Sequence, residues 1–225
     1  MGFLFFEKVP DYAEINRRIR KLNLDVLRKI NKEVTRAKTK GRIIDITLDG
    51  TGVQINGKYV WIDKKAKKIR KRDWKKVNIA IDVETRQILG IKVLEKNENE
   101  GCHKNTVDLL VDTFDNIDET AEIRRLYGDG GYDNENNFRM LEFLGIEPVI
   151  RVRRTSRIKA NYMSKSLKTK KKRKFFENKR NKVALEQFDW EKYIGNSRYG
   201  KRSGIEGIIG SFKRFFRGKY IFKIK

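Results

Sequence analysis

Cysteine and histidine are almost absent from this sequence. Among its 225 residues, Cys102 is the only cysteine and His103 is the only histidine. A single cysteine excludes an internal disulfide, and one residue of each kind excludes a zinc site built from cysteine and histidine within one chain. Any metal bound by this chain must therefore be held mainly by carboxylates.

Long hydrophobic runs are also absent. The apolar run at residues 3–6 is too short for the core of a signal peptide, and no stretch approaches the roughly 20 apolar residues of a membrane span. We therefore expect a cytoplasmic protein without a membrane partner.

Acidic residues are scarce relative to basic ones. Lysine and arginine total 54 against 30 aspartates and glutamates, which gives a formal net charge of +24. Such an excess predicts a polyanionic partner, and RNA would account for it as well as DNA. The alternative is a basic surface without a binding role.

The length suits one sizeable core with attachments. Apolar residues recur at helical spacing through residues 15–30, so we expect an N-terminal helical arm over residues 1–40. Residues 41–225 then form the main domain, with a basic insertion at 153–190. Because residues 153–182 of that insertion carry an uninterrupted basic run and only one acidic residue, Glu177, we expect this part to be loosely ordered.

Two aspartates follow predicted strands. Apolar and polar residues alternate over residues 44–48, so a strand is expected to end at Asp49, before a glycine-containing turn. A second short strand at residues 123–127 leads to Asp129. Glu206 lies on a final helix with a clear apolar face. Taken singly, these acids read as a turn residue, a partner of neighbouring glycines and a solvated helix carboxylate.

Together, the three acids suggest phosphodiester chemistry. Two divalent ions about 3.5–4 Å apart can stabilise charge on both the attacking and the leaving oxygen. Mg²⁺ and Mn²⁺ prefer oxygen ligands and retain several waters, so two or three convergent carboxylates suffice. Asp49, Asp129 and Glu206 are therefore candidate catalytic and metal-binding residues.

Further polar residues share the final helix with Glu206. The spacing of Arg202, Glu206 and Lys213 is close to a whole number of helical turns, so these side chains are expected to form one stripe. Glycine weakens a helix but lets DNA or a packed strand approach its backbone. Three glycines occur in this helix: Gly204, Gly207 and Gly210.

Here the sequence resembles a known family. Tyr199, Arg202, Glu206 and Lys213 reproduce, with all three gaps, the Tyr-Arg-Glu-Lys signature of bacterial and archaeal insertion-sequence transposases of the DDE type. Residues 48–52 are similar to that family's first-Asp motif, and residues 127–150 contain a block similar to its second-Asp motif. The resemblance extends over about residues 8–217.

The resemblance implies an α/β fold with an RNase H-like mixed sheet flanked by helices. It also implies that Asp49, Asp129 and Glu206 bind Mg²⁺ or Mn²⁺, and that Tyr199, Arg202 and Lys213 contact DNA. The expected partners are transposon ends and target DNA, with a homodimer as a candidate assembly and no small-molecule substrate. The sequence also assigns phosphate contacts to a basic run: Lys170, Lys171, Lys172, Arg173 and Lys174.

Transposases of this type commonly carry more helices before the arm and continue past the helix with the glutamate. We therefore interpret the chain as a candidate truncated copy. Two alternatives stay open. One is a decayed transposase that only binds nucleic acid, and the other is an RNase H-like nuclease or resolvase, which would share the acids but not the spaced Tyr, Arg and Lys.

Overall fold

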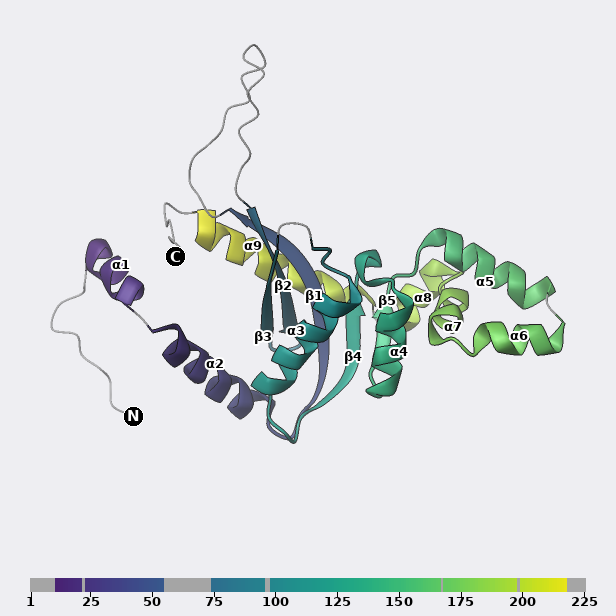
Figure 1. The fold of residues 1–225 in the computed structure, drawn as a ribbon, viewed down its shortest axis with the longest axis horizontal. Coiled ribbons are helices and arrows are strands. Elements are labelled where there is room, and N and C mark those ends of the chain that lie inside the picture. The colour runs from purple at the N-terminus through teal and green to yellow at the C-terminus, as the bar shows by residue number, and fades with distance from the viewer. Residues whose placement is uncertain are drawn as a thin grey trace, which may run out of the picture.

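The centre of the fold is a mixed sheet of five strands in the order β3-β2-β1-β4-β5 (Figure 1). In this computed structural model, residues 11–21, 23–54, 74–95, 98–166, 168–197 and 199–217 are described. Strands β1, β2 and β3 pair antiparallel, whereas β1, β4 and β5 pair parallel. This arrangement confirms the predicted RNase H-like α/β fold. The strands are β1 (Ile43–Gln54), β2 (Trp74–Asp82), β3 (Ile88–Leu94), β4 (Glu122–Gly128) and β5 (Glu147–Ile150).

Helices precede, separate and follow these strands. Those before and between the strands are α1 (Tyr12–Lys21), α2 (Leu24–Thr39), α3 (His103–Asn116), the short 3-10 helix η1 (Gly130–Tyr132) and α4 (Glu135–Phe143). Those after β5 are α5 (Arg154–Ser166), α6 (Thr169–Phe176), α7 (Lys179–Glu186), α8 (Trp190–Ser197), the 3-10 helix η2 (Tyr199–Ser203) and α9 (Gly204–Arg217).

The sheet has two differently covered faces, because neighbouring residues of a strand point to opposite sides. On one face, residues 44, 46 and 48 of β1 join the main apolar core with Leu109 of α3 and Phe138 of α4. On the other face, a smaller cluster packs β2 against Ile205 and Ile209 of α9. Asp49 belongs to this second face, since it alternates with the core residues.

Strand β1 is longer than the sequence predicted. The expected turn after Asp49 is not formed, because β1 continues to Gln54 and Asp49 itself pairs with Ile79 of β2. Gly50 and Gly52 remain in the ladder, opposite Asn78 and Lys76. The placement of Asp49 at a strand end is therefore wrong. The sequence also predicts a strand or hairpin arm over residues 53–62, and most of these residues lie outside the described part of the chain.

The basic segment is ordered, contrary to the sequence prediction. Residues 154–166, 169–176 and 179–186 form α5, α6 and α7, and they bury three small side chains in the main core: Ala160, Val183 and Ala184. The side chain of Gln187 is also buried, accepting a hydrogen bond from the Val152 amide at 2.7 Å and donating one to the Ile150 carbonyl at 2.6 Å. This segment is therefore ordered despite its basic composition, because its few inward side chains pack in the core or form buried hydrogen bonds.

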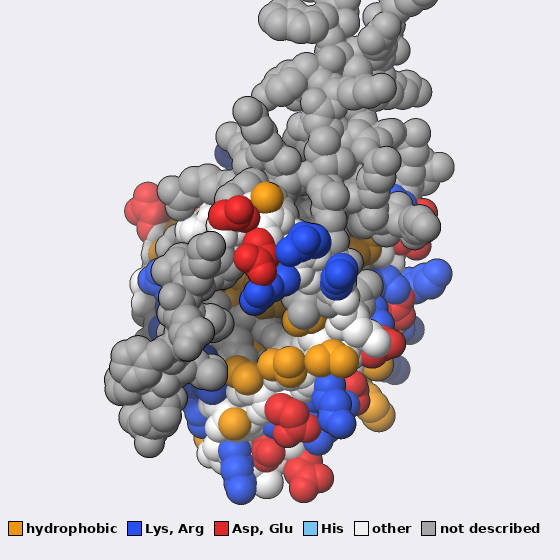
Figure 2. Space-filling view, turned by 90° about the vertical axis from the view of Figure 1, so that its left-hand side faces the viewer, with side chains coloured by type: hydrophobic (Ala, Val, Ile, Leu, Met, Phe, Trp, Pro, Cys, Tyr) orange, Lys and Arg blue, Asp and Glu red, His pale blue; other side chains and the backbone are white. Residues whose placement is uncertain are grey.

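The N-terminal helices extend from one end of the sheet (Figure 1). The apolar spacing over residues 15–30 suits one or two helices separated near Asn23. Asn23 caps α2, accepting a hydrogen bond from the Asp25 amide at 2.8 Å, so a break at this point is confirmed. The same helix exposes Val26, Ile30 and Val34. Figure 2 shows this side of the molecule, where hydrophobic and charged side chains lie close together. None of the described helices is both long and apolar enough to cross a membrane.

Candidate active site

The pairing of β1 with β4 places two aspartates side by side. Thr47 is in register with Tyr127 in this parallel pair. Asp49 and Asp129 each lie two residues further along, so they come from equivalent positions on adjacent strands and on the same side of the sheet. Asp129 lies just past the end of β4, where its carboxylate accepts a hydrogen bond from the Gly131 amide at 2.8 Å.

Helix α9 brings Glu206 to the same face. The neighbouring residue, Ile205, is buried against β2, which fixes the helix on the sheet and leaves Glu206 exposed. Burial raises the pKa of the Asp49 carboxyl, Arg202 opposes that rise, and the negative charges of Asp129 and Glu206 add to it. The structure thus brings all three predicted acids within electrostatic range of one another.

Arg202 lies on η2, one turn before α9 begins, and not on α9 itself. Its guanidinium lies 3.5 Å from the Asp49 carboxylate. The predicted stripe of residues on a single helix is therefore wrong for Arg202. Gly200 within η2 and Gly204 at the start of α9 lower the helix propensity there. In this structure Arg202 neutralises part of the charge that gathers around Asp49.

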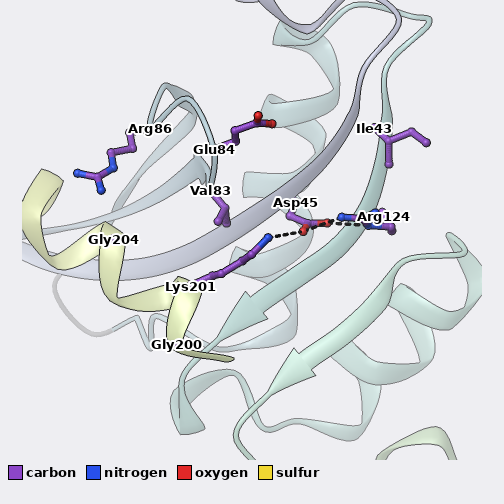
Figure 3. Close-up of a pocket in the computed structure, with 9 residues that line it drawn as sticks. All are labelled: Ile43, Asp45, Val83, Glu84, Arg86, Arg124, Gly200, Lys201 and Gly204. Carbon is purple, nitrogen blue, oxygen red and sulfur yellow. Dashed lines mark hydrogen bonds and ion pairs between the residues drawn. The ribbon is translucent and has the colours of Figure 1, made fainter. Parts of the chain in front are cut away.

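A second ion pair anchors η2 to the same strand. Lys201 Nζ lies 3.8 Å from Asp45, whose carboxylate also accepts two hydrogen bonds from Arg124 at 3.0 and 2.9 Å. Figure 3 shows these three side chains converging between β1, β4 and η2. Since Lys201 and Arg202 are consecutive and both reach acids of β1, they fix the turn that leads to Glu206.

A cavity of about 570 Å³ opens beside this anchor. Figure 3 shows Arg86 and Glu84 at one side of it and Arg124 at the other. The Asp45 carboxylate is already paired with Arg124 and Lys201. The cavity therefore adjoins the candidate site without containing its three acids.

Tyr199 is packed against an aromatic cluster. Its hydroxyl donates a hydrogen bond to the Gly128 carbonyl at 3.4 Å, and its ring meets Trp190 edge-on at 5.2 Å. Arg151 and Arg157 each lie 5.1 Å from the Trp190 ring. Burial raises the pKa of the Tyr199 hydroxyl, and the two nearby arginines, Arg202 and Arg151, oppose that rise. Tyr199 thus joins α8 to the strand end that carries Asp129.

The predicted DNA contacts of residues 170–174 do not join this group. The basic run of residues 170–174 lies on α6, with every side chain exposed. Figure 1 shows α6 at the end of the molecule opposite the N-terminal helices, away from the start of α9. Lys213 falls within α9, but its side chain is outside the described part of the chain.

Comparison with known proteins agrees with this architecture. The family model for the transposase DDE domain matches residues 38–220, which is most of the chain. The chain belongs to the DDE transposase family.

Solved structures similar to this DDE transposase domain include two Mos1 complexes. In the crystal structure of the Mos1 strand transfer complex, the matched chain is 10% identical with a TM-score of 0.36, and the match covers 91% of this chain and 65% of that chain. For the pre-cleavage Mos1 transpososome the values are 9%, 0.32, 87% and 66%. This chain therefore spans about two thirds of the length of those chains.

The donor set of this DDE transposase domain suits a hard divalent cation. Its three acids offer only oxygen ligands, and the repulsion felt by Asp49 is what a bound cation would relieve. Among the described residues, no three acids, cysteines or histidines close around a single point as they stand. The Arg202 guanidinium lies beside the Asp49 carboxylate instead, so the three acids fit a metal by chemistry and grouping, and their side chains would have to move to reach one ion together.

Sequence reasoning missed one acid of this transposase domain. Glu100 lies in the loop before α3, and a Cβ atom built on Gly50 would collide with its carboxyl group. Glu100 therefore lies against the backbone next to Asp49. Its position in a loop with no motif gave no signal, and only the glycine at position 50 hinted that something approaches β1 closely.

Proposed function

We propose that this chain is a metal-dependent DNA transposase that cuts and joins DNA at the ends of an insertion sequence. The observation that carries the proposal is the grouping of Asp49, Asp129 and Glu206 on one face of the sheet, in a chain of the DDE transposase family. Mg²⁺ or Mn²⁺ is the expected cofactor, because all three side chains are carboxylates.

The side chains have separable tasks in this proposal. Asp49, Asp129 and Glu206 would hold two divalent ions, whose chemistry is to stabilise charge on the attacking and leaving oxygens of the phosphodiester. Tyr199 and Arg202 lie beside the acids and would contact the DNA end, with Lys213 further along α9. No side chain needs to bond covalently to DNA, because water and then the freed 3′-hydroxyl serve as nucleophiles.

The glycines of α9 support an approach of DNA from the open side of the helix. A Cβ atom added at Gly204, Gly207 or Gly210 would meet nothing within 4 Å among the described residues. Of the two explanations that the sequence left open, a tightly packed strand finds no support in the described structure. Close approach by a DNA backbone is consistent with these glycines.

We extend this proposal to the domain organisation and the partners of the chain. Residues 1–40 would form an arm on a catalytic domain of residues 41–225, within which 153–190 is a basic insertion that contacts phosphates. DNA is the partner, as transposon ends and as target, and a homodimer is the assembly to test.

The test is nicking and strand transfer on a plasmid that carries the inverted repeats flanking this coding sequence. We expect cleavage with Mg²⁺ or Mn²⁺, none in chelator, and none for Asp129→Asn. The matched acid-to-amide control is Glu142→Gln, at the exposed far end of α4. DNA binding without any metal-dependent cleavage would show a decayed transposase, and cleavage without preference for the repeats would favour a nuclease.

A further inference from the structure

Glu100 lies between the segments that carry the two strand aspartates. On one side its carboxyl group touches the backbone at Gly50, next to Asp49. On the other side, the following residue, Gly101, packs so closely on the Gly131 carbonyl that a Cβ atom there would overlap it. Gly131 is also the residue whose amide binds Asp129. The loop that carries Glu100 therefore contacts the backbone next to both aspartates.

Buried asparagines hold this loop in place. Asn78 of β2 donates a hydrogen bond to the Glu100 carbonyl at 2.7 Å, Asn105 of α3 donates one to the Asn99 carbonyl at 2.9 Å, and Asn137 of α4 donates one to the Gly101 carbonyl at 3.1 Å. All three asparagines are fully buried. Three separate elements thus fix the backbone of Glu100, and this degree of support is typical of functional positions.

The support given to the backbone around Glu100 does not extend to its carboxylate. It makes no hydrogen bond or ion pair with any described residue, whereas Asp45 and Asp133 are each paired with an arginine. Glu100 is partly buried, and a partly buried carboxylate without a partner in the described structure is unfavourable. The arrangement is explained if a cation completes it.

Tyr132 supplies an independent sign that something binds here. The residue is 1% exposed, and its hydroxyl finds no hydrogen-bond partner among the described residues. Burial raises the pKa of this hydroxyl, and the charges of Asp49, Asp129 and Glu100 raise it further, so all three acids lie within electrostatic range of it. A buried hydroxyl left unpaired is destabilising. A hydrated cation among these acids would satisfy both the hydroxyl and the carboxylates.

We propose that Glu100 is a fourth carboxylate ligand of the divalent metal site, beside Asp49, Asp129 and Glu206. This inference rests on the proposed function, since it adds a ligand to the site assigned there. Two ions bound by hard oxygen ligands have room for four carboxylates, each ion keeping several waters. Glu100 would act from the loop that precedes α3, opposite the helix that carries Glu206.

Binding of Mn²⁺ alone, without DNA, tests this ligand. Metal-stripped wild type, Asp49→Asn, Glu100→Gln and Glu142→Gln would be titrated with Mn²⁺, and free Mn²⁺ counted by electron paramagnetic resonance. We expect Glu100→Gln to weaken binding by about tenfold or more, Asp49→Asn to weaken it at least as much, and Glu142→Gln to bind as wild type does. Circular dichroism checks that each variant is folded, and Glu100→Asp provides a second variant that keeps the charge but shortens its reach.

The outcomes separate this inference from the proposed function. Wild-type binding that Asp49→Asn reduces but Glu100→Gln and Glu100→Asp leave unchanged would overturn the role of Glu100 alone. An absence of Mn²⁺ binding by wild type, or identical binding by wild type and Asp49→Asn, would overturn the metal site itself and the fourth ligand with it.

Discussion

The acidic site and the basic helices α5 to α7 place their charges in different ways. At the acidic site, strand register and the packing of α9 bring Asp49, Asp129 and Glu206 to one place. On α6, five consecutive basic residues point around the helix into solvent. The first arrangement is specific to individual atoms, whereas the second supplies only a local density of charge.

This difference predicts opposite responses to substitution. A single neutral replacement at the acidic site removes a ligand that no neighbour can replace. A single replacement on α6 leaves several equivalent cations within reach of the same phosphates. Substitutions at the acidic site should therefore reduce cleavage activity but leave the free energy of unfolding almost unchanged. DNA affinity should fall clearly only when several charges of the basic run are removed together.

The largest effect is expected for Glu206→Gln. Loss of this ligand should reduce metal-dependent cleavage by at least about a thousandfold, equivalent to about 4 kcal/mol of activation free energy. Because Glu206 is exposed, the free energy of unfolding should change by less than about 0.5 kcal/mol. Cleavage rates and urea denaturation measure the two quantities.

DNA binding by the Glu206→Gln protein should equal that of wild type in chelator, as a gel-shift titration would show. Full cleavage by this variant would contradict the idea that each carboxylate of the acidic site is needed individually. A matched loss of binding and cleavage would place Glu206 among the DNA contacts instead.

The next effect concerns how the basic helices are attached. Arg180 of α7 binds the fully buried Asp133 carboxylate at 2.6 and 2.9 Å. Arg180→Met leaves that carboxylate with the Arg153 amide as its remaining described donor, so unfolding should become easier by about 3 kcal/mol. Urea denaturation measures the loss, with Lys182→Met on the same helix as control.

The double variant Asp133→Asn, Arg180→Met should recover part of that stability, since no buried charge is left unpaired. If Arg180→Met alone is as stable as wild type, α7 is not held through this pair, and the basic helices are attached by their apolar contacts alone.

Replacing all five residues of the run 170–174 with Ser should give a smaller effect. Because consecutive helical positions point in different directions, we expect two or three of the five to face one DNA backbone. The slope of log affinity against log salt should then flatten by about 2, which weakens binding by about a hundredfold at 0.1 M salt. An unchanged slope would show that α6 does not touch DNA.

The smallest effect is expected for a single replacement in that run. Lys172→Ser should change the salt slope by less than about 1 and the affinity by less than about tenfold. Cleavage of bound DNA should proceed at the wild-type rate. A single lysine that carries most of the slope change would contradict the equivalence of these cations and would indicate a specific phosphate contact.

Local patterns predicted the elements that hold the site. The alternation at residues 44–48 predicted a strand with Ile44, Ile46 and Leu48 inward, and all three are buried. The apolar spacing around Glu206 likewise predicted a helix, and Ile205 and Ile209 are buried against the sheet. Such predictions succeed because one apolar face decides both the element and its orientation.

Other features depend on contacts between distant segments. Composition predicted a loose segment at 153–182, but a few inward side chains and the Asp133–Arg180 pair order it. Helical spacing predicted that α9 includes Arg202, but Arg202 lies in the preceding 3-10 helix, beside Asp49. Glu100 has no local pattern at all. The register of β1 against β4 is also non-local, so no spacing in the sequence could place Asp49 beside Asp129.

The contact between Gly101 and Gly131 also limits which sequences this site accepts. The two backbones touch because neither residue carries a side chain at that point. One additional methyl group at position 101 would push apart the two loops that present Glu100 and Asp129. The width of the acidic site therefore depends on the lack of a Cβ atom at Gly101, and Gly101→Ala would alter this width without changing any charge.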